Sequence, residues 1–320
     1  QRQMCIRDRP IVVPKHQSRG LSIERLVISL YAKGMSVADI ESEMQEIYGI
    51  NLSTSAISII TNKVSQAATE WQNRPLDSLY MIVWMDGIVF KVRENGKVIN
   101  KTVYLCVGLN KEGLKEVLGM WIGKNESAAF WMGVLTDLKA RGVEDILITV
   151  TDNLNGFTET IKSVFPASTT QICVVHQIRN SCRYVVWKEK KEFTADLKNI
   201  YNAPTKEAAE MELDNFEQKW GAKYPYAIRS WRNNWEELTV FFDFPVEIRK
   251  IIYTTNLIEN LNGKIRKYTK NKLSFPNDDA LKKSVYLAIN EIEKKWYQPI
   301  WNWALIFNQF ITIFENRIQV

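Results

Sequence analysis

Residues 79–107 read LYMIVWMDGIVFKVRENGKVINKTVYLCV and decide the fold. Two apolar runs, 80–92 and 98–107, flank the turn Glu94-Asn95-Gly96-Lys97. Asn-Gly between two such runs is a strong signal for a β-hairpin, because both residues tolerate the positive φ of a tight turn. The stretch therefore predicts two antiparallel strands, with Asp86 inside the first.

Three further strands and two helices are predicted downstream. They are a strand at 116–122, a helix at 127–141, a strand at 146–151, a helix at 156–164 and a strand at 169–174. The run 146–151 is almost entirely apolar, which implies burial on both faces. Three antiparallel strands followed by alternating helices and buried strands predict an α/β fold with a mixed five-stranded sheet between helices.

The rest of the chain is predicted to be helical. Residues 177–250 are rich in tryptophan and read as an all-helical insertion, and a helix at 256–268 and two more, ending at Trp296 and near Phe314, close the chain. At the other end, 22–64 reads as three short helices: 23–33, one capped by Ser36 that runs to about 48, and 53–64.

These amino-terminal helices have the spacing of a helix-turn-helix that enters a DNA major groove. The third one is polar, and its short side chains suit contacts to phosphates and base edges. The candidate DNA-binding residues are Ser53, Thr54, Ser58, Asn62 and Lys63. A plain three-helix packing element explains the same spacing.

Composition narrows the class of protein. The 320 residues are 46% hydrophobic and 24% charged, which indicates a globular chain with a large core. A net charge of +6 permits a polyanionic partner without demanding one. The apolar stretch 304–314 is too short and too interrupted to span a membrane. The four cysteines show no paired spacing, which favours reduced thiols and an intracellular, cytoplasmic location.

Two aspartates stand at informative places in the predicted sheet. Asp86 interrupts the first strand, where an ionised carboxylate is costly unless it is solvated, paired or bound to a cation. Asp152 follows the fourth strand, and open α/β sheets place ligands at the carboxyl ends of their strands. An ordinary strand-edge aspartate and a turn or capping aspartate are the alternatives.

Glu259 lies on the predicted helix 256–268. Leu257, Ile258, Leu261 and Ile265 form an apolar stripe at helical spacing, so Glu259 lies on the opposite face with Asn256. The alternative is a capping box, in which Asn256 caps the helix and Glu259 is its reciprocal partner three residues on.

Collinear blocks along the chain identify a family. They are SLYAKGMSVADI, WQNRPLD, VINKTVYLCVGLN, KEVLGMWIG, FWMGVLTDLKARGV, QICVVHQIRNS, SWRNNWEELTVFF, IRKIIYTTNLIENLNGKIRK and IEKKWYQPIWNWALIFNQF. With these blocks the chain resembles the Mutator-type transposases of bacterial insertion sequences from about Pro14 to its end. The resemblance implies a catalytic core with a ribonuclease H-like fold.

The resemblance also implies a catalytic site. The acidic triad of the family falls on Asp86, Asp152 and Glu259, with separations of 152 − 86 = 66 and 259 − 152 = 107 residues. Its Cys-x-x-His signature falls on Cys173 and His176. Carboxylates of this kind hold two Mg²⁺ or Mn²⁺ ions, about 3.5 to 4 Å apart, that activate water and later a DNA 3′-hydroxyl.

Cys173 and His176 are expected to support the active site, together with Asn256, and not to bind zinc. The chain has only two histidines and no second cysteine pair nearby, so four zinc ligands are hard to assemble.

A basic cluster follows the glutamate and is expected to grip DNA phosphates. It consists of Lys264, Arg266, Lys267, Lys270 and Lys272. A solvated charged face is the alternative. Trp187, Trp231 and Trp235 are predicted to be core residues, with stacking on an unpaired base as the other interpretation.

The chain departs from the family at three places. Gly87 stands where alanine is common, and Asn153 replaces a glycine, which is expected to alter the turn that aims Asp152. Family members carry a longer amino-terminal region, so we expect truncation here, with 1–20 disordered or artefactual. The expected domains are 21–75 for DNA binding, 76–176 and 251–320 for the catalytic core, and 177–250 for the insertion.

The sequence thus predicts a transposase that acts on terminal inverted repeats and target DNA as a homodimer near the nucleoid. One rival is a truncated DNA-binding derivative that competes for element ends without cutting them. A second rival is a nuclease that cuts without joining.

Overall fold

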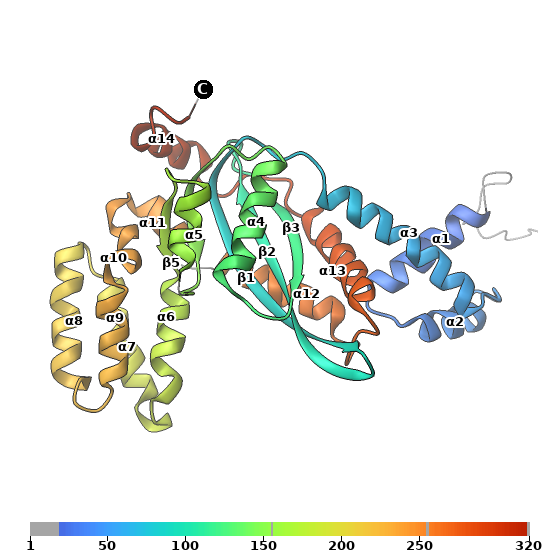
Figure 1. Ribbon diagram of the computed structural model, residues 1–320, viewed down its shortest axis with the longest axis horizontal. Helices are drawn as coiled ribbons and strands as arrows, with labels where there is room; N and C mark the ends of the chain where they lie inside the picture. Colours follow the sequence, from blue (N-terminus) through green and yellow to red (C-terminus); the bar gives the residue numbers. More distant parts are fainter. Residues whose placement is uncertain (1–18, 155, 254–255, 319–320) are drawn as a thin grey trace, which may run out of the picture.

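The structure is a computed structural model that describes residues 19–154, 156–253 and 256–318 (Figure 1). A sheet lies at its centre, with amino-terminal helices to one side and a helical region to the other (Figure 1). Most of the segment 1–20 lies outside the described residues, and its last two residues, Arg19 and Gly20, begin the first helix, α1.

The sheet contains five strands in the order β3-β2-β1-β4-β5. They are β1 (Leu79–Glu94), β2 (Lys97–Leu109), β3 (Lys115–Gly123), β4 (Asp145–Thr151) and β5 (Thr169–Ile172). Strand β2 pairs antiparallel with both β1 and β3, whereas β4 pairs parallel with β1 and β5 pairs parallel with β4. The predicted mixed five-stranded sheet is therefore confirmed.

The turn between β1 and β2 has the predicted form. Asn95 and Gly96 have φ values of 50° and 76°, and Glu94 pairs with Lys97 across them. Positive φ at both central residues matches the right-handed twist of the flanking strands. The Asn-Gly dipeptide thus fixes the register of the whole hairpin.

The fifth strand ends earlier than predicted. It stops at Ile172, and Cys173 is the N-cap of helix α6 (Val174–Ser181), so the predicted extension to Val174 was wrong. The backbone N–H of Val174 donates to Tyr253 O at 3.1 Å and not to β4. A tertiary contact from a distant segment outweighs the β propensity of this apolar run.

Helices cover both faces of the sheet and bury alternate residues of β1. Ile82 and Trp84 belong to the core shared with α12 (Asn256–Thr269) and α13 (Asp278–Glu293). Val83 and Met85 belong to the core shared with α4 (Ala128–Ala140) and α5 (Phe157–Val164). Because strand side chains alternate between faces, Asp86 shares the α12 face with Trp84.

The region between the sheet and α12 is helical, as predicted. It contains α6, α7 (Lys190–Tyr201), α8 (Lys206–Trp220), α9 (Pro225–Asn233), α10 (Trp235–Leu238) and α11 (Val246–Ile252). Phe193 and Trp220 of this region are buried in the same hydrophobic cluster as Trp84 of the sheet. The insertion therefore packs as an extension of the central core.

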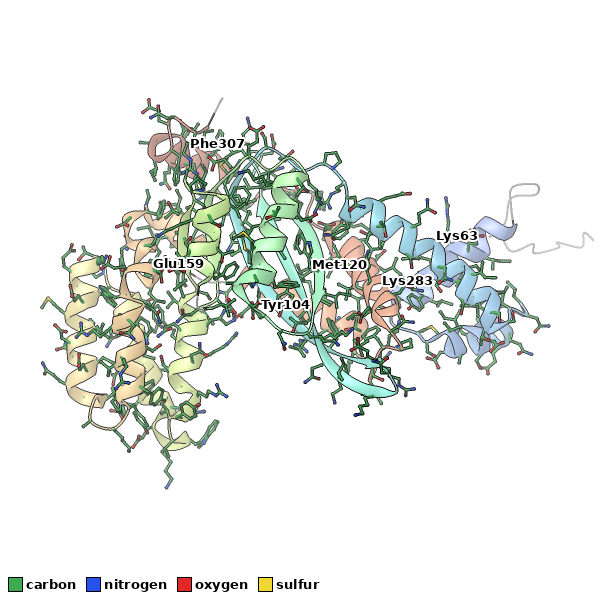
Figure 2. The ribbon with its side chains drawn as sticks, in the orientation of Figure 1. Lys63, Tyr104, Met120, Glu159, Lys283 and Phe307 are labelled. Atoms are coloured by element: carbon green, nitrogen blue, oxygen red, sulfur yellow. The ribbon has the colours of Figure 1, made fainter. Side chains whose placement is uncertain are left out.

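Three helices precede the sheet: α1 (Arg19–Ala32), α2 (Val37–Glu46) and α3 (Thr54–Gln72). Ser36 caps α2 in a capping box with Asp39, and Ser53 caps α3. The third helix continues well past its predicted end at 64, because it also packs on α13. Lys283 of α13, which is labelled in Figure 2, donates to Asn62 Oδ1 on α3 at 3.0 Å.

The last helix, α14 (Trp303–Ile313), follows α13. No helix in the described part of the chain combines the length and the apolar character needed to cross a bilayer.

Candidate active site

Asp86 and Asp152 lie at the same level of two neighbouring parallel strands. The last paired residues of β1 and β4 are Trp84 and Val150, and each aspartate follows two residues later. Because strand side chains alternate between the two faces, each aspartate points to the same face as the apolar residue two positions earlier, Trp84 or Val150. The half-buried Asp86 therefore lies in the middle of β1, beside the end of β4, where the half-buried Asp152 follows. Asp86 lies on the face of the sheet that α12 covers.

Helix α12 reaches Asp86 through a residue that the sequence did not suggest. Asn262 Nδ2 donates to Asp86 Oδ2 at 2.8 Å, and the backbone N–H of Gly87 donates to Asp86 Oδ1, also at 2.8 Å. Asn262 is buried on the inner face of α12. Its amide on an otherwise apolar helix stripe, three residues after Glu259, is the signal that could have found it.

Glu259 lies on the same helix and is paired. Arg179 donates to both of its carboxylate oxygens, from Nη1 to Oε1 at 2.6 Å and from Nη2 to Oε2 at 3.0 Å. His176 Nε2 lies 3.7 Å from Glu259 Oε1. Asn256, the expected supporting residue, is the exposed first residue of α12. The residue before it, where a cap would stand, lies outside the described residues.

Cys173 and His176 enter the site from α6. Strand β5 runs parallel to β4, and Ile172 pairs with Thr151. Cys173, which follows Ile172, therefore lies level with Asp152, which follows Thr151. A hydrogen bond with the buried Cys173, together with the negative charges of Asp86 and Asp152, raises the pKa of His176 from 6.5 to about 9. At neutral pH the imidazole is therefore a cation among carboxylates.

The carboxyl groups themselves are unusually basic. Burial raises the pKa of Asp152 from 3.8 to about 7, and the negative charges of Glu126 and Asp86 add to the shift. Burial also raises the pKa of Asp86, although the charge of His176 opposes it. Desolvated acids that repel one another are typical of functional sites.

Glu126 is a second residue that the sequence reasoning missed. It lies before α4, where Trp131 Nε1 donates to its Oε1 at 2.8 Å. Burial and the charge of Asp86 raise the pKa of Glu126. It adds a fourth carboxyl group to the neighbourhood of the triad.

The donor atoms suit a hard divalent cation in kind. Asp152 Oδ1 is buried and has no hydrogen-bond partner among the described residues. Carboxylate oxygens are the ligands that Mg²⁺ and Mn²⁺ prefer. Yet no three histidine, cysteine, aspartate or glutamate side chains of the described residues are grouped closely enough to hold one ion.

The predicted basic cluster divides into two parts. Lys264, Arg266, Lys267 and Lys270 are exposed on α12 or at its end. Lys272 instead points inward, where its Nζ donates to Ser284 Oγ at 2.9 Å and lies 3.8 Å from the ring centre of Tyr31. Burial lowers the pKa of Lys272 to about 8. Its ammonium group joins α12 to α1 and α13.

The candidate DNA-binding residues of α3 are mostly exposed. Ser53 is the N-cap, and Thr54 is exposed on the first turn. Ser58 is half-buried, Lys63 pairs with Glu24 on α1 at 2.6 Å, and Asn62 accepts from Lys283. The ammonium group of Lys63 and the amide oxygen of Asn62 therefore already have partners within the protein.

The three tryptophans of the insertion differ in burial. Trp231 and Trp235 are buried, which confirms the prediction of core residues. Trp187 is 84% exposed, so that prediction was wrong for it. It lies in a short 3-10 turn after α6, outside the helix packing that buries the other two.

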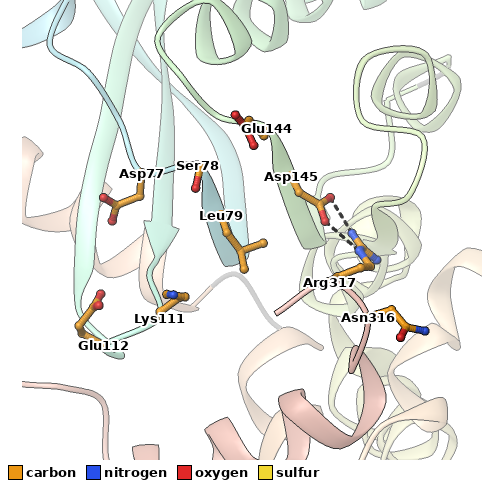
Figure 3. A pocket seen from close by; sticks show the side chains of 9 residues that line it. All are labelled: Asp77, Ser78, Leu79, Lys111, Glu112, Glu144, Asp145, Asn316 and Arg317. Atoms are coloured by element: carbon orange, nitrogen blue, oxygen red, sulfur yellow. Dashed lines mark hydrogen bonds and ion pairs between the residues drawn. The ribbon is translucent and has the colours of Figure 1, made fainter. Parts of the chain in front are cut away.

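A separate hollow lies at the opposite edge of the sheet. Leu79 and Asp145, the first residues of β1 and β4, line it, and Arg317 donates to both oxygens of Asp145 (Figure 3). Asp86 lies in the middle of β1, seven residues from Leu79, and Asp152 directly follows the other end of β4. The hollow is therefore distinct from the candidate active site.

Known proteins were compared with the chain. A family described as "Transposase, Mutator family" matches residues 8–299. A probable transposase for an ISRM3-like insertion sequence element of Sinorhizobium fredii is 42% identical, over 96% of this chain and 77% of that protein. A probable insertion sequence transposase of Corynebacterium diphtheriae is 40% identical, over 89% of this chain and 84% of that one.

Among solved structures, the simian T-cell lymphotropic virus intasome in complex with PP2A regulatory subunit B56 gamma matches 62% of this chain and 67% of that one. The identity is 14% and the TM-score 0.24, which supports no conclusion.

Proposed function

The chain belongs to the Mutator family of transposases, and on this premise we propose that it cuts and rejoins DNA strands with divalent metal ions held by Asp86, Asp152 and Glu259. Such a reaction uses no covalent link between protein and DNA. It therefore needs carboxylates at one place and a grip on phosphates, but no serine or tyrosine nucleophile.

One observation carries the proposal. Asp86, in the middle of β1, and Asp152, directly after the end of β4, lie level with each other, and Asp86 is hydrogen-bonded to α12, the helix that bears Glu259. Residues 66 and 107 positions apart in sequence have no local reason to meet there. The sheet order β3-β2-β1-β4-β5 supports a ribonuclease H-like fold for 76–176 and 251–320, with 177–250 as the insertion.

The residues of the site have separate roles in this proposal. Asp86, Asp152 and Glu259 would hold two Mg²⁺ or Mn²⁺ ions, which when bound supply activation of the attacking oxygen and stabilisation of the leaving one. Asn262 fixes the rotamer of Asp86 by donating to Oδ2. His176 balances the acidic charge at neutral pH, with Cys173 beside it.

DNA contacts complete the function. Exposed Lys264, Arg266, Lys267 and Lys270 are proposed to bind phosphates. Residues 21–75 are proposed to form a helix-turn-helix unit that reads element ends through the exposed side of α3. Two ends must be cut in concert, so a homodimer on terminal inverted repeats and target DNA is part of the proposal.

The test is metal-dependent cleavage of DNA cloned from the borders of the element that encodes this chain. Asp86→Asn, Asp152→Asn and Glu259→Gln are each expected to abolish nicking in Mg²⁺ or Mn²⁺ while binding in a gel-shift assay persists. Glu159→Gln, on the exposed side of α5 (Figure 2), is the matched control and should cut normally. Equal cutting by wild type and all three variants would overturn the proposal.

The same assay separates the rivals. A wild-type protein that shifts border DNA but never nicks it would be the non-cutting DNA-binding derivative. Nicking without joined products from pre-cut ends would indicate a nuclease.

A further inference from the structure

A groove runs between the carboxyl-terminal halves of three helices that are far apart in sequence. Two adjoining hollows of about 360 Å³ each share three lining residues: Lys33, which directly follows α1, Tyr268 of α12 and Glu291 of α13. Basic residues dominate the lining: Arg25, Lys33, Lys264, Lys267, Lys294 and Lys295. We call this surface the basic groove.

The charge of the basic groove is not compensated within the described part of the protein. Its six cations face one acidic residue, Glu291, which gives 6 − 1 = +5, against +6 for the whole chain. Glu291 is paired with Lys294. The other five cations have no acidic partner among residues 19–154, 156–253 and 256–318.

Several cations elsewhere in the protein are paired. On the insertion, Lys206 pairs with Glu236 at 2.6 Å, Lys219 pairs with Asp196 at 2.7 Å, and Arg232 pairs with Glu217 at 2.7 Å. A solvated helix face normally carries such pairs. The basic groove therefore differs from these paired parts of the surface.

The walls of the basic groove are held together by close packing. Gly34, directly after Lys33, has φ +95°, and a Cβ there would lie 2.3 Å from the carbonyl oxygen of Tyr268. Only glycine allows this approach of the α1 end to α12. Lys272, in the loop after α12, contacts Tyr31 of α1 and Ser284 of α13. The backbone positions that carry the cations are thus held close to one another.

The basic groove does not coincide with the candidate active site. At 3.6 residues per turn, Lys264 lies about 140° around α12 from Glu259, on the other flank of the helix. Lys267 lies about 12 Å along the helix axis from Glu259, at 1.5 Å per residue. That length corresponds to roughly three to four base pairs of duplex.

We propose that the basic groove binds the phosphate backbone of double-stranded DNA a few base pairs away from the bond that is cut. The inference rests on the proposed function, because it takes DNA as the ligand. It adds α1 and α13 to the surface that grips the substrate. By holding the flanking duplex, the groove would set which phosphodiester reaches the carboxylates.

The test removes three cations from the groove in the full chain. The variant Arg25→Gln/Lys33→Gln/Lys295→Gln, at exposed groove positions with no role in the proposed function, is compared with wild type and with Lys188→Gln/Lys191→Gln/Lys198→Gln, which removes the same charge from exposed lysines of the insertion. Circular dichroism and thermal melting check that both variants are folded. Dissociation constants for a border duplex are measured across a series of salt concentrations.

The groove variant is expected to bind the duplex at least about tenfold more weakly, and the slope of log K against log salt should fall by about 2 to 3, at about 0.9 per lost phosphate contact. The insertion variant should keep most of the wild-type slope. An unchanged slope in the groove variant, or equal losses in both, would overturn the inference. Binding to vesicles with anionic lipid, lost in the groove variant while DNA binding stays, would also overturn it.

Failure of the groove and failure of the proposed function are distinguishable. If the groove inference holds, the variant still nicks DNA in Mg²⁺ at saturating protein concentration, because the carboxylates are intact. If the wild type never nicks DNA but the slope falls as expected, the groove stands and the catalytic proposal does not.

Discussion

Arg179 holds both carboxylate oxygens of Glu259, with nitrogen–oxygen distances of 2.6 and 3.0 Å. The fork geometry of a guanidinium makes this the strong, two-bonded form of an ion pair. Glu259 is one of the three proposed metal ligands, so the pair occupies the oxygens that a cation would need. Arg179 is also 58% exposed, and can turn away without breaking the core.

Arg179→Ala is therefore expected to tighten the binding of Mn²⁺ by up to about fivefold, since a partly exposed ion pair is worth about 1 kcal/mol or less. Isothermal titration calorimetry with Mn²⁺ measures this without DNA. Arg179→Lys keeps the charge but loses the fork and should give an intermediate affinity. Weaker Mn²⁺ binding by Arg179→Ala would mean that Arg179 positions Glu259 for the ion and does not compete with it.

Asp152 makes the stability of the protein depend on pH. Its pKa is about 7 in the folded protein against 3.8 ordinarily, so the folded state binds the proton more tightly than the unfolded one. The free energy of unfolding therefore falls as pH rises from about 4 to about 7, with the full loss above 7. Asp152→Asn removes this loss and is expected to melt a few degrees higher than wild type at pH 8.

The measurement is thermal melting of wild type and Asp152→Asn in EDTA between pH 4 and pH 8. The difference in melting temperature should close toward pH 4, where wild-type Asp152 is protonated. A difference that stays constant over the whole range would contradict the burial of an ionised carboxylate.

Asn262 is expected to act as a positioning residue for Asp86. Asn262→Ala removes the donor to Asp86 Oδ2, and loss of such a supporting partner typically costs 10- to 100-fold in metal affinity or activity. Both Mn²⁺ affinity and DNA nicking should fall, while DNA binding is unchanged. Asn260→Ala, at an exposed position of the same helix, is the matched control. Normal Mn²⁺ affinity in Asn262→Ala would leave Asn262 with a structural role only.

The elements of the fold could be predicted because each has a local cause. The Asn95-Gly96 turn, the apolar run of β4 and the serine caps of α2 and α3 each depend on a few neighbouring residues. The end of β5 was not predictable in this way. It depends on a hydrogen bond from Val174 to Tyr253, a residue 79 positions away (253 − 174).

The candidate site shows the same division. The carboxylates were found through the family resemblance and their place in the predicted elements, whereas Arg179, Asn262 and Glu126 emerged only once distant segments were brought together. Asn153 was expected to disturb the turn after β4, yet its φ is not positive, so the position does not require glycine. Gly87 has a packing reason: a Cβ there would lie 2.7 Å from Thr102 Cγ2.

Truncation of Trp187 and truncation of Trp231 should differ strongly in their effect on the free energy of unfolding, because burial and not residue type decides the loss of stability. Trp231 is 1% exposed and its Nε1 donates to Ser181 Oγ at 2.9 Å, so Trp231→Ala leaves a large cavity and removes this hydrogen bond. It is expected to lower the free energy of unfolding by about 3 to 5 kcal/mol. Trp187→Ala at the 84% exposed position should change it by less than about 0.5 kcal/mol. Urea unfolding of the two variants beside wild type measures both values, and a loss of several kcal/mol for Trp187→Ala would show that its indole is packed in solution.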